Sequence, residues 1–437
     1  MPHSSYRIIG LALAGAITLT SGSFAQSDDS LKQEVTTLKG RVAELEALVN
    51  RLLTAGSEVK VVEKREGSPK AVEFASSDPA PTLVSADKSG QFNIRGRLFM
   101  DWSMGDDKQG TFDYSGTKMR AAWFGVDGNV TKDIKYKFEA DFGSNATSVK
   151  DAYLQFNRGD WSYTVGQSKI PNSLEWNTAI SQTTVMERAS FKDAFGFGRG
   201  MGVKAATNGD NWSFTAGAFQ GTNKFSSNTD ESLTLAARAT WGQKLDAGTY
   251  LLGISGRFRD MNDSGSLSYK AKATSNQSGT MASFAGQEKD TTVGAEFAYS
   301  GNGFFGTAEY AWLKADDAVA VSRSATFEGG YVELGYILTG EDRPLDLKKG
   351  IWGRPKVSSP VDKGGMGLWM LSGRMEHLDL TDNGAFGGEQ DSYILSLSWY
   401  MNRYLRTILQ YGHTSLDDAG GFTNKADIVG VRFNIDW

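Results

Sequence analysis

The sequence predicts an all-β fold: a transmembrane antiparallel β-barrel of about 16 strands, preceded by a short N-terminal coiled-coil helix. Apolar and polar residues alternate with period two through most of 91–437. The 437 residues include 51 Gly and only 8 Pro, and 11% are aromatic. The mean hydropathy is only −0.37. Strands of a membrane barrel turn apolar side chains to lipid and polar ones to the lumen, so this low average fits a membrane barrel.

The composition also excludes several classes of function. The chain has no Cys, which rules out a disulfide framework, thiolate metal sites and a cysteine nucleophile. Its three His leave little room for a zinc enzyme or a catalytic triad, and the net charge of −5 does not suggest a nucleic-acid binder. We therefore expect no enzyme activity, no catalytic or metal-ligating residues, no cofactor and no nucleic-acid partner.

The first segment, 1–25, reads as a secretory signal peptide. Arg7 precedes the apolar stretch 8–19, and Ser23-Phe24-Ala25 has the small-x-small form of a cleavage site. The alternative is a short buried helix. After this segment no apolar run reaches the eighteen residues that a membrane helix needs.

The second segment, 27–57, carries a heptad pattern. Leucine recurs every seven residues, with valine three residues before each later leucine: Leu31, Val35, Leu38, Val42, Leu45, Val49 and Leu52. Val at position a and Leu at position d favour a coiled coil, and more often a dimer. The alternative is an amphipathic helix lying on its own domain. The range 58–90, which is polar and contains Pro69, Pro79 and Pro81, is predicted to be a linker.

The third segment, 91–437, is predicted to be the barrel. Each alternating segment is a predicted strand. The connections after odd-numbered predicted strands are mostly long and those after even-numbered ones mostly short, as in outer-membrane barrels. The stretch 339–365 breaks this rule, because it is long where a short turn is expected. In the second predicted strand Phe124 falls on the same parity as Arg120, so the apolar residues change from one face of the strand to the other. Three charged residues fall on the apolar parity, all near run ends: Asp127, Lys150 and Asp427. A soluble β-sandwich is the alternative fold.

Cations on the lumen parity suggest a basic arc across the closing seam of the barrel, and acidic residues of later strands form a separate sector. The predicted pore-lining arc comprises Arg95, Arg97, Arg120, Lys135, Lys137, Arg374, Arg406 and Arg432. A ring or ladder of Arg and Lys favours anions in a pore. The alternative is that these residues pair with neighbouring carboxylates, so that they keep the lumen polar and hydrated but do not select anions.

The long connection 170–199 is the predicted constriction loop, because its glycines permit a compact fold against the wall. An ordinary surface loop is the alternative. Its charged residues have both signs: Glu175, Glu187, Arg188, Lys192 and Arg199.

Short motifs give the chain a resemblance to a known family. Lys-Asp-Ala-Tyr-Leu at 150–154, Gly-Gln-Ser-Lys-Ile-Pro at 166–171 and Met-Glu-Arg at 186–188 resemble the phosphate-selective porin O and P family. The resemblance implies a sixteen-stranded, trimeric outer-membrane porin whose third loop narrows the pore, with passage of phosphate or other anions. In the family a basic cluster in the constriction binds phosphate. Here the predicted loop has no lysine cluster, which departs from that pattern.

We therefore expect a porin of the bacterial outer membrane that lets small hydrophilic solutes diffuse passively and prefers anions such as phosphate. Its expected partners are outer-membrane lipid, further copies of itself in a trimer, and small anions. One alternative is a general or sugar-admitting porin without anion specificity. Another is a structural tether that holds the envelope through the coiled coil.

Overall fold

The computed structural model describes most of 73–437 and a few residues before it: 36–37, 39–41, 43–44, 46–47, 73–76, 80–110, 113–143, 147–220, 232–262, 265–318, 324–418 and 421–437. Contacts divide the chain into two units, 1–69 and 70–437. In the first unit the described residues between 36 and 47 are helical, within the predicted heptad segment. The predicted signal peptide and the rest of the heptad segment lie outside the described residues. None of the described helices is long and apolar enough to cross a membrane.

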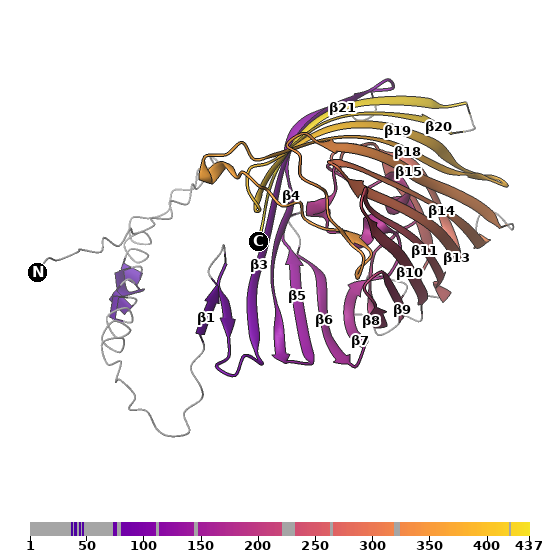
Figure 1. The fold of residues 1–437 in the computed structure, drawn as a ribbon. Helices are drawn as coiled ribbons and strands as arrows, with labels where there is room; N and C mark the ends of the chain where they lie inside the picture. Colours follow the sequence, from indigo (N-terminus) through magenta and orange to yellow (C-terminus); the bar gives the residue numbers. More distant parts are fainter. Residues whose placement is uncertain are drawn as a thin grey trace, which may run out of the picture. The chain divides into compact units, whose positions relative to one another are not determined.

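Sixteen antiparallel strands of the second unit form a closed ring (Figure 1). Each pairs with the next along the ring, and the last pairs with the first: β3 (Gln91–Asp107), β4 (Tyr114–Thr131), β5 (Ile134–Asp141), β6 (Ser148–Arg158), β7 (Trp161–Lys169), β8 (Arg199–Asn208), β9 (Trp212–Phe219), β10 (Leu233–Leu245), β11 (Gly248–Asp260), β13 (Thr280–Gly301), β14 (Phe304–Ala318), β15 (Ala325–Ile337), β18 (Leu368–Asp382), β19 (Ala385–Tyr400), β20 (Leu405–Asp417) and β21 (Thr423–Asp436). The predicted barrel of about 16 strands is confirmed.

Along the strands of the ring, outward-facing and inward-facing side chains alternate. On β20 the outward Leu409 and Tyr411 are about half exposed, whereas the inward Arg406 and Gln410 are buried. The barrel thus carries apolar side chains outside and polar ones inside, as a lipid-facing barrel with a wet interior requires. At the seam, Arg432 of β21 lies opposite Asp101 of β3 in register.

Two β-bulges account for the irregular parity. Between β3 and β4 the register shifts at Arg120, so Met119 is exposed on the outside before the bulge and Phe124 after it. A second shift between β5 and β6 falls at Lys150, whose Nζ lies 3.2 Å from Asp141 Oδ2. Because a bulge inserts one residue and re-aims the side chains beside it, Asp127 returns to the inward parity and meets Arg95.

Strand length is uneven around the ring. Strands β5 and β9 have 8 residues each, whereas β13 has 22 and β19 has 16. Figure 1 shows the wall from β5 to β9 as the short side and the orange and yellow strands as the long side. The range predicted as a linker, 58–90, contains two short strands, β1 (Glu73–Ser76) and β2 (Thr82–Val84), which extend the sheet from β3.

Three segments fold inside the ring. The connection between β7 and β8 contains α2 (Leu174–Asn177), η1 (Ile180–Gln182) and α3 (Ser190–Ala194), drawn in magenta within the strands in Figure 1. Strand β12 (Leu267–Lys272) pairs with the first part of β13 as a hairpin. The connection after β15 is the long stretch that broke the loop rule, and it contains β16 (Leu345–Asp346), β17 (Ile351–Trp352) and η3 (Val361–Lys363). Only its part around β17 is inside, where Trp352 packs with Leu174, whereas η3 has no buried residue.

Candidate functional site

The segment 170–199 fills part of the lumen. Most of its residues are buried, and Ser173 caps α2 by accepting a hydrogen bond from the backbone N–H of Trp176 at 3.0 Å. Phe191, Phe195 and Phe197 form edge-to-face pairs inside the barrel. These rings belong to an apolar cluster that also includes residues of β12, β14, β15 and β18. The segment is therefore packed against the inner wall.

Arginines of the wall bind this segment. Arg374 Nη1 lies 2.6 Å from Glu175 Oε1, and its other nitrogens contact Glu333. Arg406 donates to the Thr183 carbonyl at 2.6 Å. All of these side chains are buried, so each contact forms in a poorly solvated interior where an unpaired charge would be costly.

Glu187 joins the segment to the barrel seam. Its carboxylate accepts two hydrogen bonds from Arg120, at 2.7 and 2.8 Å, and one from Arg432 at 2.6 Å. Arg432 also binds Asp101 through two nitrogens. Burial opposes ionisation of Glu187, but the two arginines outweigh it and hold the pKa of its carboxyl below its usual range. This carboxylate is the centre of a latch between the segment, β3, β4 and β21.

A cavity of about 420 Å³ remains beside the packed segment. Its wall comes from β3 to β8, from 170–199 and from the connection after β15. Eight cationic side chains line it: Arg95, Arg97, Lys137, Lys169, Arg188, Arg199, Lys204 and Lys349. Only two carboxylates line it, Glu139 and Asp151. Trp123 forms part of the same wall, and the Arg97 guanidinium lies 4.6 Å from its ring centre.

The cations of this cavity differ in what balances their charge. Asp151 binds both Lys137 and Arg199 at 2.7 Å. In contrast, Lys169 donates to three backbone carbonyls at the end of α2, those of residues 176–178. Arg188 likewise donates to carbonyls, at Glu175 and Thr178. A carbonyl dipole orients a cation without cancelling its charge, so the cavity retains a positive excess.

Arg188 remains charged at neutral pH despite its position. Burial is the main influence and lowers its pKa to about 10, still above the neutral range. Its guanidinium lies 5.0 Å from the Trp176 ring, a cation–π distance.

A second cavity of about 340 Å³ adjoins the first. The two share Arg95, Arg97 and Glu139, so these residues lie between them. The second is also lined by Arg354, Arg403 and residues of the chain terminus. Together the cavities follow the β3 side of the lumen.

The structure divides the predicted basic arc into two groups. Arg95, Arg97 and Lys137 line the first cavity. Arg120, Arg374, Arg406 and Arg432 instead bind the inward segment, and Lys135 is exposed near the start of β5. Of the predicted constriction residues, Arg188 and Arg199 line the cavity, Glu175 and Glu187 are anchors, and Lys192 lies 2.5 Å from Asp193.

Sequence reasoning missed Lys169 and Lys204 as cavity residues. The signal for Lys204 was present, because it alternates with the exposed Val203 on β8. Lys169 stands at the end of β7 and enters the cavity through its contacts with α2, which no periodicity predicts.

The hairpin of β12 and β13 bridges the lumen above α3. At its tip Gln277 donates to the Gly116 carbonyl at 3.1 Å, and Ser275 lies 3.2 Å from Ser103, both on the opposite wall. Gln410 of β20 donates to the Thr274 carbonyl at 3.0 Å. The hairpin therefore reaches the β3–β4 wall further along these strands than the first cavity, whose β3 residues are Arg95 and Arg97.

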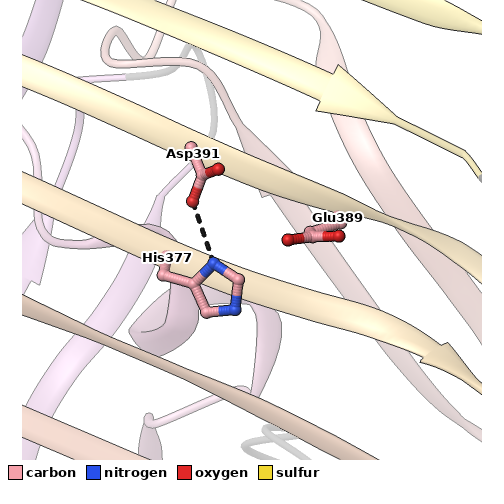
Figure 2. Close-up of side chains that lie close together, drawn as sticks. All are labelled: His377, Glu389 and Asp391. Atoms are coloured by element: carbon pink, nitrogen blue, oxygen red, sulfur yellow. Dashed lines mark hydrogen bonds and ion pairs between the residues drawn. The ribbon is translucent and has the colours of Figure 1, made fainter.

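A different cluster lies on the outside of the barrel. His377 of β18 and Glu389 and Asp391 of β19 have ligand atoms within 4.8 Å of one another (Figure 2). His377 Nδ1 lies 2.9 Å from Asp391 Oδ1. Sequence reasoning did not single out this group, because the pairing of β18 with β19 is what brings its members together.

Comparison with known proteins agrees with this architecture. A protein of Caulobacter vibrioides, described as an uncharacterized protein, is 28% identical over 98% of this chain and 96% of its own length. Porin O of Pseudomonas aeruginosa is 24% identical over 79% of this chain and 90% of its own. The trimer form of OmpT, an outer membrane protein of Vibrio cholerae, shares the fold with a TM-score of 0.50, at 11% identity over 80% of this chain and all of that one.

The family model that matches is that of phosphate-selective porin O and P, and it covers residues 92–437. This range contains the ring of strands except for the first residue of β3, and every lining residue of the first cavity. The chain therefore belongs to the phosphate-selective porin O and P family, whose place is the bacterial outer membrane.

Proposed function

We propose that this porin is an anion-preferring channel for small hydrophilic solutes such as phosphate. The observation that carries the proposal is the excess of cations over carboxylates in the first cavity, together with the hydrogen bonds that Arg188 donates to backbone carbonyls. An anion in this cavity gains favourable Coulomb energy, and a cation loses it. Arg side chains can also bind phosphate oxygens through two nitrogens.

The path of the solute follows the two adjoining cavities. Arg95 and Arg97 stand where the cavities meet, so a solute passing from one to the other comes within reach of both. Arg97 lies against Trp123 and has only a loose ion pair with Asp436, at 4.0 Å, whereas Arg95 forms a direct hydrogen bond with Asp127. We therefore expect Arg97 to contribute more to selectivity than Arg95, whose charge is largely balanced.

The test is the reversal potential of the purified channel in a KCl gradient. Anion selectivity is expected, and Arg97→Ala should weaken it more than Arg95→Ala. A cation-selective sign would overturn the proposal. Equal permeation of neutral sugars and anions in liposome swelling would favour the general porin instead.

We also propose that the protein assembles as a homotrimer. The support is the family and the trimer form of the structurally similar OmpT. Light scattering of the detergent-solubilised protein should give three protomers, and a monomer at all concentrations would contradict the proposal.

A further inference from the structure

The outer wall of the barrel carries a groove of about 510 Å³ across five consecutive strands, from β13 to β19. The outward residues of its floor are small, namely Ala295, Ala308 and Gly330, and the buried, inward-parity residues Glu296, Glu309, Tyr331 and Glu376 lie between them. Larger side chains flank it, namely Phe297, Tyr310, Val332, Met375 and Tyr393. Since this face meets the membrane, hydrocarbon is the natural occupant of a hollow with such walls.

The strand register shows how the groove runs. Ala295, Tyr310, Gly330, His377 and Asp391 are direct cross-strand partners in one row. Four strand spacings of about 4.8 Å give the row a length of roughly 19 Å. One leaflet of a hydrocarbon core about 30 Å thick is about 15 Å deep, so the groove has the length of an acyl chain.

The two ends of the row lie at different heights. His377 is nine residues from the short-turn end of β18 at Leu368, whereas Ala295 is six residues from that end of β13 at Gly301. At about 3.3 Å per residue and a tilt near 40°, these are roughly 23 and 15 Å above the turns. In an apolar band about 25 Å tall that begins at the turns, the Ala295 end lies well within hydrocarbon, whereas the His377 end lies about 2 Å inside the outer edge, next to the headgroups.

The headgroup end is acidic. Glu389 and Asp391 face outward beside His377, and His377 Nδ1 contacts Asp391 Oδ1 (Figure 2). In the next row outward, Glu328, Asp379 and Glu389 are direct cross-strand partners. Like charges placed opposite one another are destabilising, so this end of the groove attracts positive charge.

We propose that the groove binds an outer-leaflet lipid with a phosphorylated headgroup, through a divalent cation at Glu389 and Asp391. One acyl chain lies over Ala295, Ala308 and Gly330. A hard cation such as Mg²⁺ is commonly held by one or two carboxylates together with the phosphate of its partner, which this arrangement supplies. His377 orients the Asp391 carboxylate and does not itself need to bind the ion.

The test is native mass spectrometry of the purified protein with diphosphorylated lipid A. Retained lipid is expected in Mg²⁺ and should fall at least about tenfold in EDTA, because the cation joins two anionic partners. The double variant Glu389→Gln/Asp391→Asn should lose lipid to the same extent. Its matched control is Asp427→Asn, since His413 and Asp427 form an equivalent outward pair at 2.9 Å away from the groove.

A second pair of variants tests the groove itself. Ala295→Leu fills the floor and should reduce retention, whereas Ala237→Leu, at an outward position of β10, should not. Unchanged conductance and heat-modifiable migration of every variant would show an intact barrel. Retention that ignores EDTA, equal loss in Asp427→Asn, or preferential retention of phosphatidylethanolamine would overturn the proposal.

Discussion

Replacing Arg188 by Gln tests the charge of the cavity most directly. The substitution removes one charge that carbonyls orient but do not neutralise, and Gln can still donate a hydrogen bond to one of them. A sphere of 420 Å³ has a radius of about 4.6 Å, which places a lining guanidinium roughly 7 Å from an ion at the centre once atomic radii are added.

The expected effect follows from this distance. At the dielectric constant of water, two unit charges 7 Å apart interact by about 0.6 kcal/mol, or one RT. Removing Arg188 lowers the anion occupancy of the cavity about 2.7-fold and raises the cation occupancy by the same factor. The two factors multiply, so the ratio of anion to cation permeability should fall about sevenfold. A lower local dielectric would enlarge the change.

The assay is the reversal potential in KCl gradients at low and high ionic strength. The Debye length is about 10 Å at 0.1 M and 3 Å at 1 M, so the difference between variant and parent should nearly vanish at high salt. Arg158→Gln is the matched control, because Arg158 is exposed on the outward parity at the end of β6. An unchanged ratio in Arg188→Gln, or an equal change in Arg158→Gln, would refute the reasoning.

The pH profile provides an independent check. With its pKa lowered to about 10, Arg188 stays protonated from pH 5 to 8, so the part of the selectivity that Arg188 supplies should be constant there. As the pH rises through about 10 the cavity loses this charge, so the parent should lose anion selectivity. Arg188→Gln should lack that part of the change.

Three further predictions concern the lumen and the N-terminal segment. Glu187→Gln leaves the buried Arg120 and Arg432 short of a carboxylate and should destabilise the latch by about 3–5 kcal/mol, seen as faster proteolysis within 170–199. In the parent protein, Glu187 has a lowered pKa, so its stabilisation of the latch is fully present above about pH 4.5, the ordinary pKa of a glutamate, and is lost only in stronger acid. Proteolysis of the parent that already rises at pH 6 would contradict this. Replacing 267–286 by a short turn should raise single-channel conductance, and no rise would mean that the hairpin lies outside the water-filled volume. Deleting 27–57 should leave permeability unchanged; envelope detachment on deletion would favour the tether, and an intact envelope would count against it.

Much of the architecture follows from local pattern. Alternation in strands such as β20 and β21 predicts which residues face lipid, because a charge on that face in mid-bilayer costs about 2–4 kcal/mol. Hence the barrel, its strand number and its inward loop could be expected from residues alone. The bulges at Arg120 and Lys150 show in the sequence only as a change of parity, and the pairing with the neighbouring strand is needed to identify the inserted residue.

The sequence by itself determined that this protein is a barrel with a charged interior, because period-two alternation is a property of neighbouring residues. Only the tertiary structure decided what each charge does. Arg374 and Arg188 both lie within the lumen, yet Arg374 meets carboxylates that are distant in the sequence, whereas Arg188 donates hydrogen bonds to backbone carbonyls. Whether a buried cation is neutralised depends on partners far along the chain, so the charge available to a solute is settled only when the ring closes and the inward segment packs.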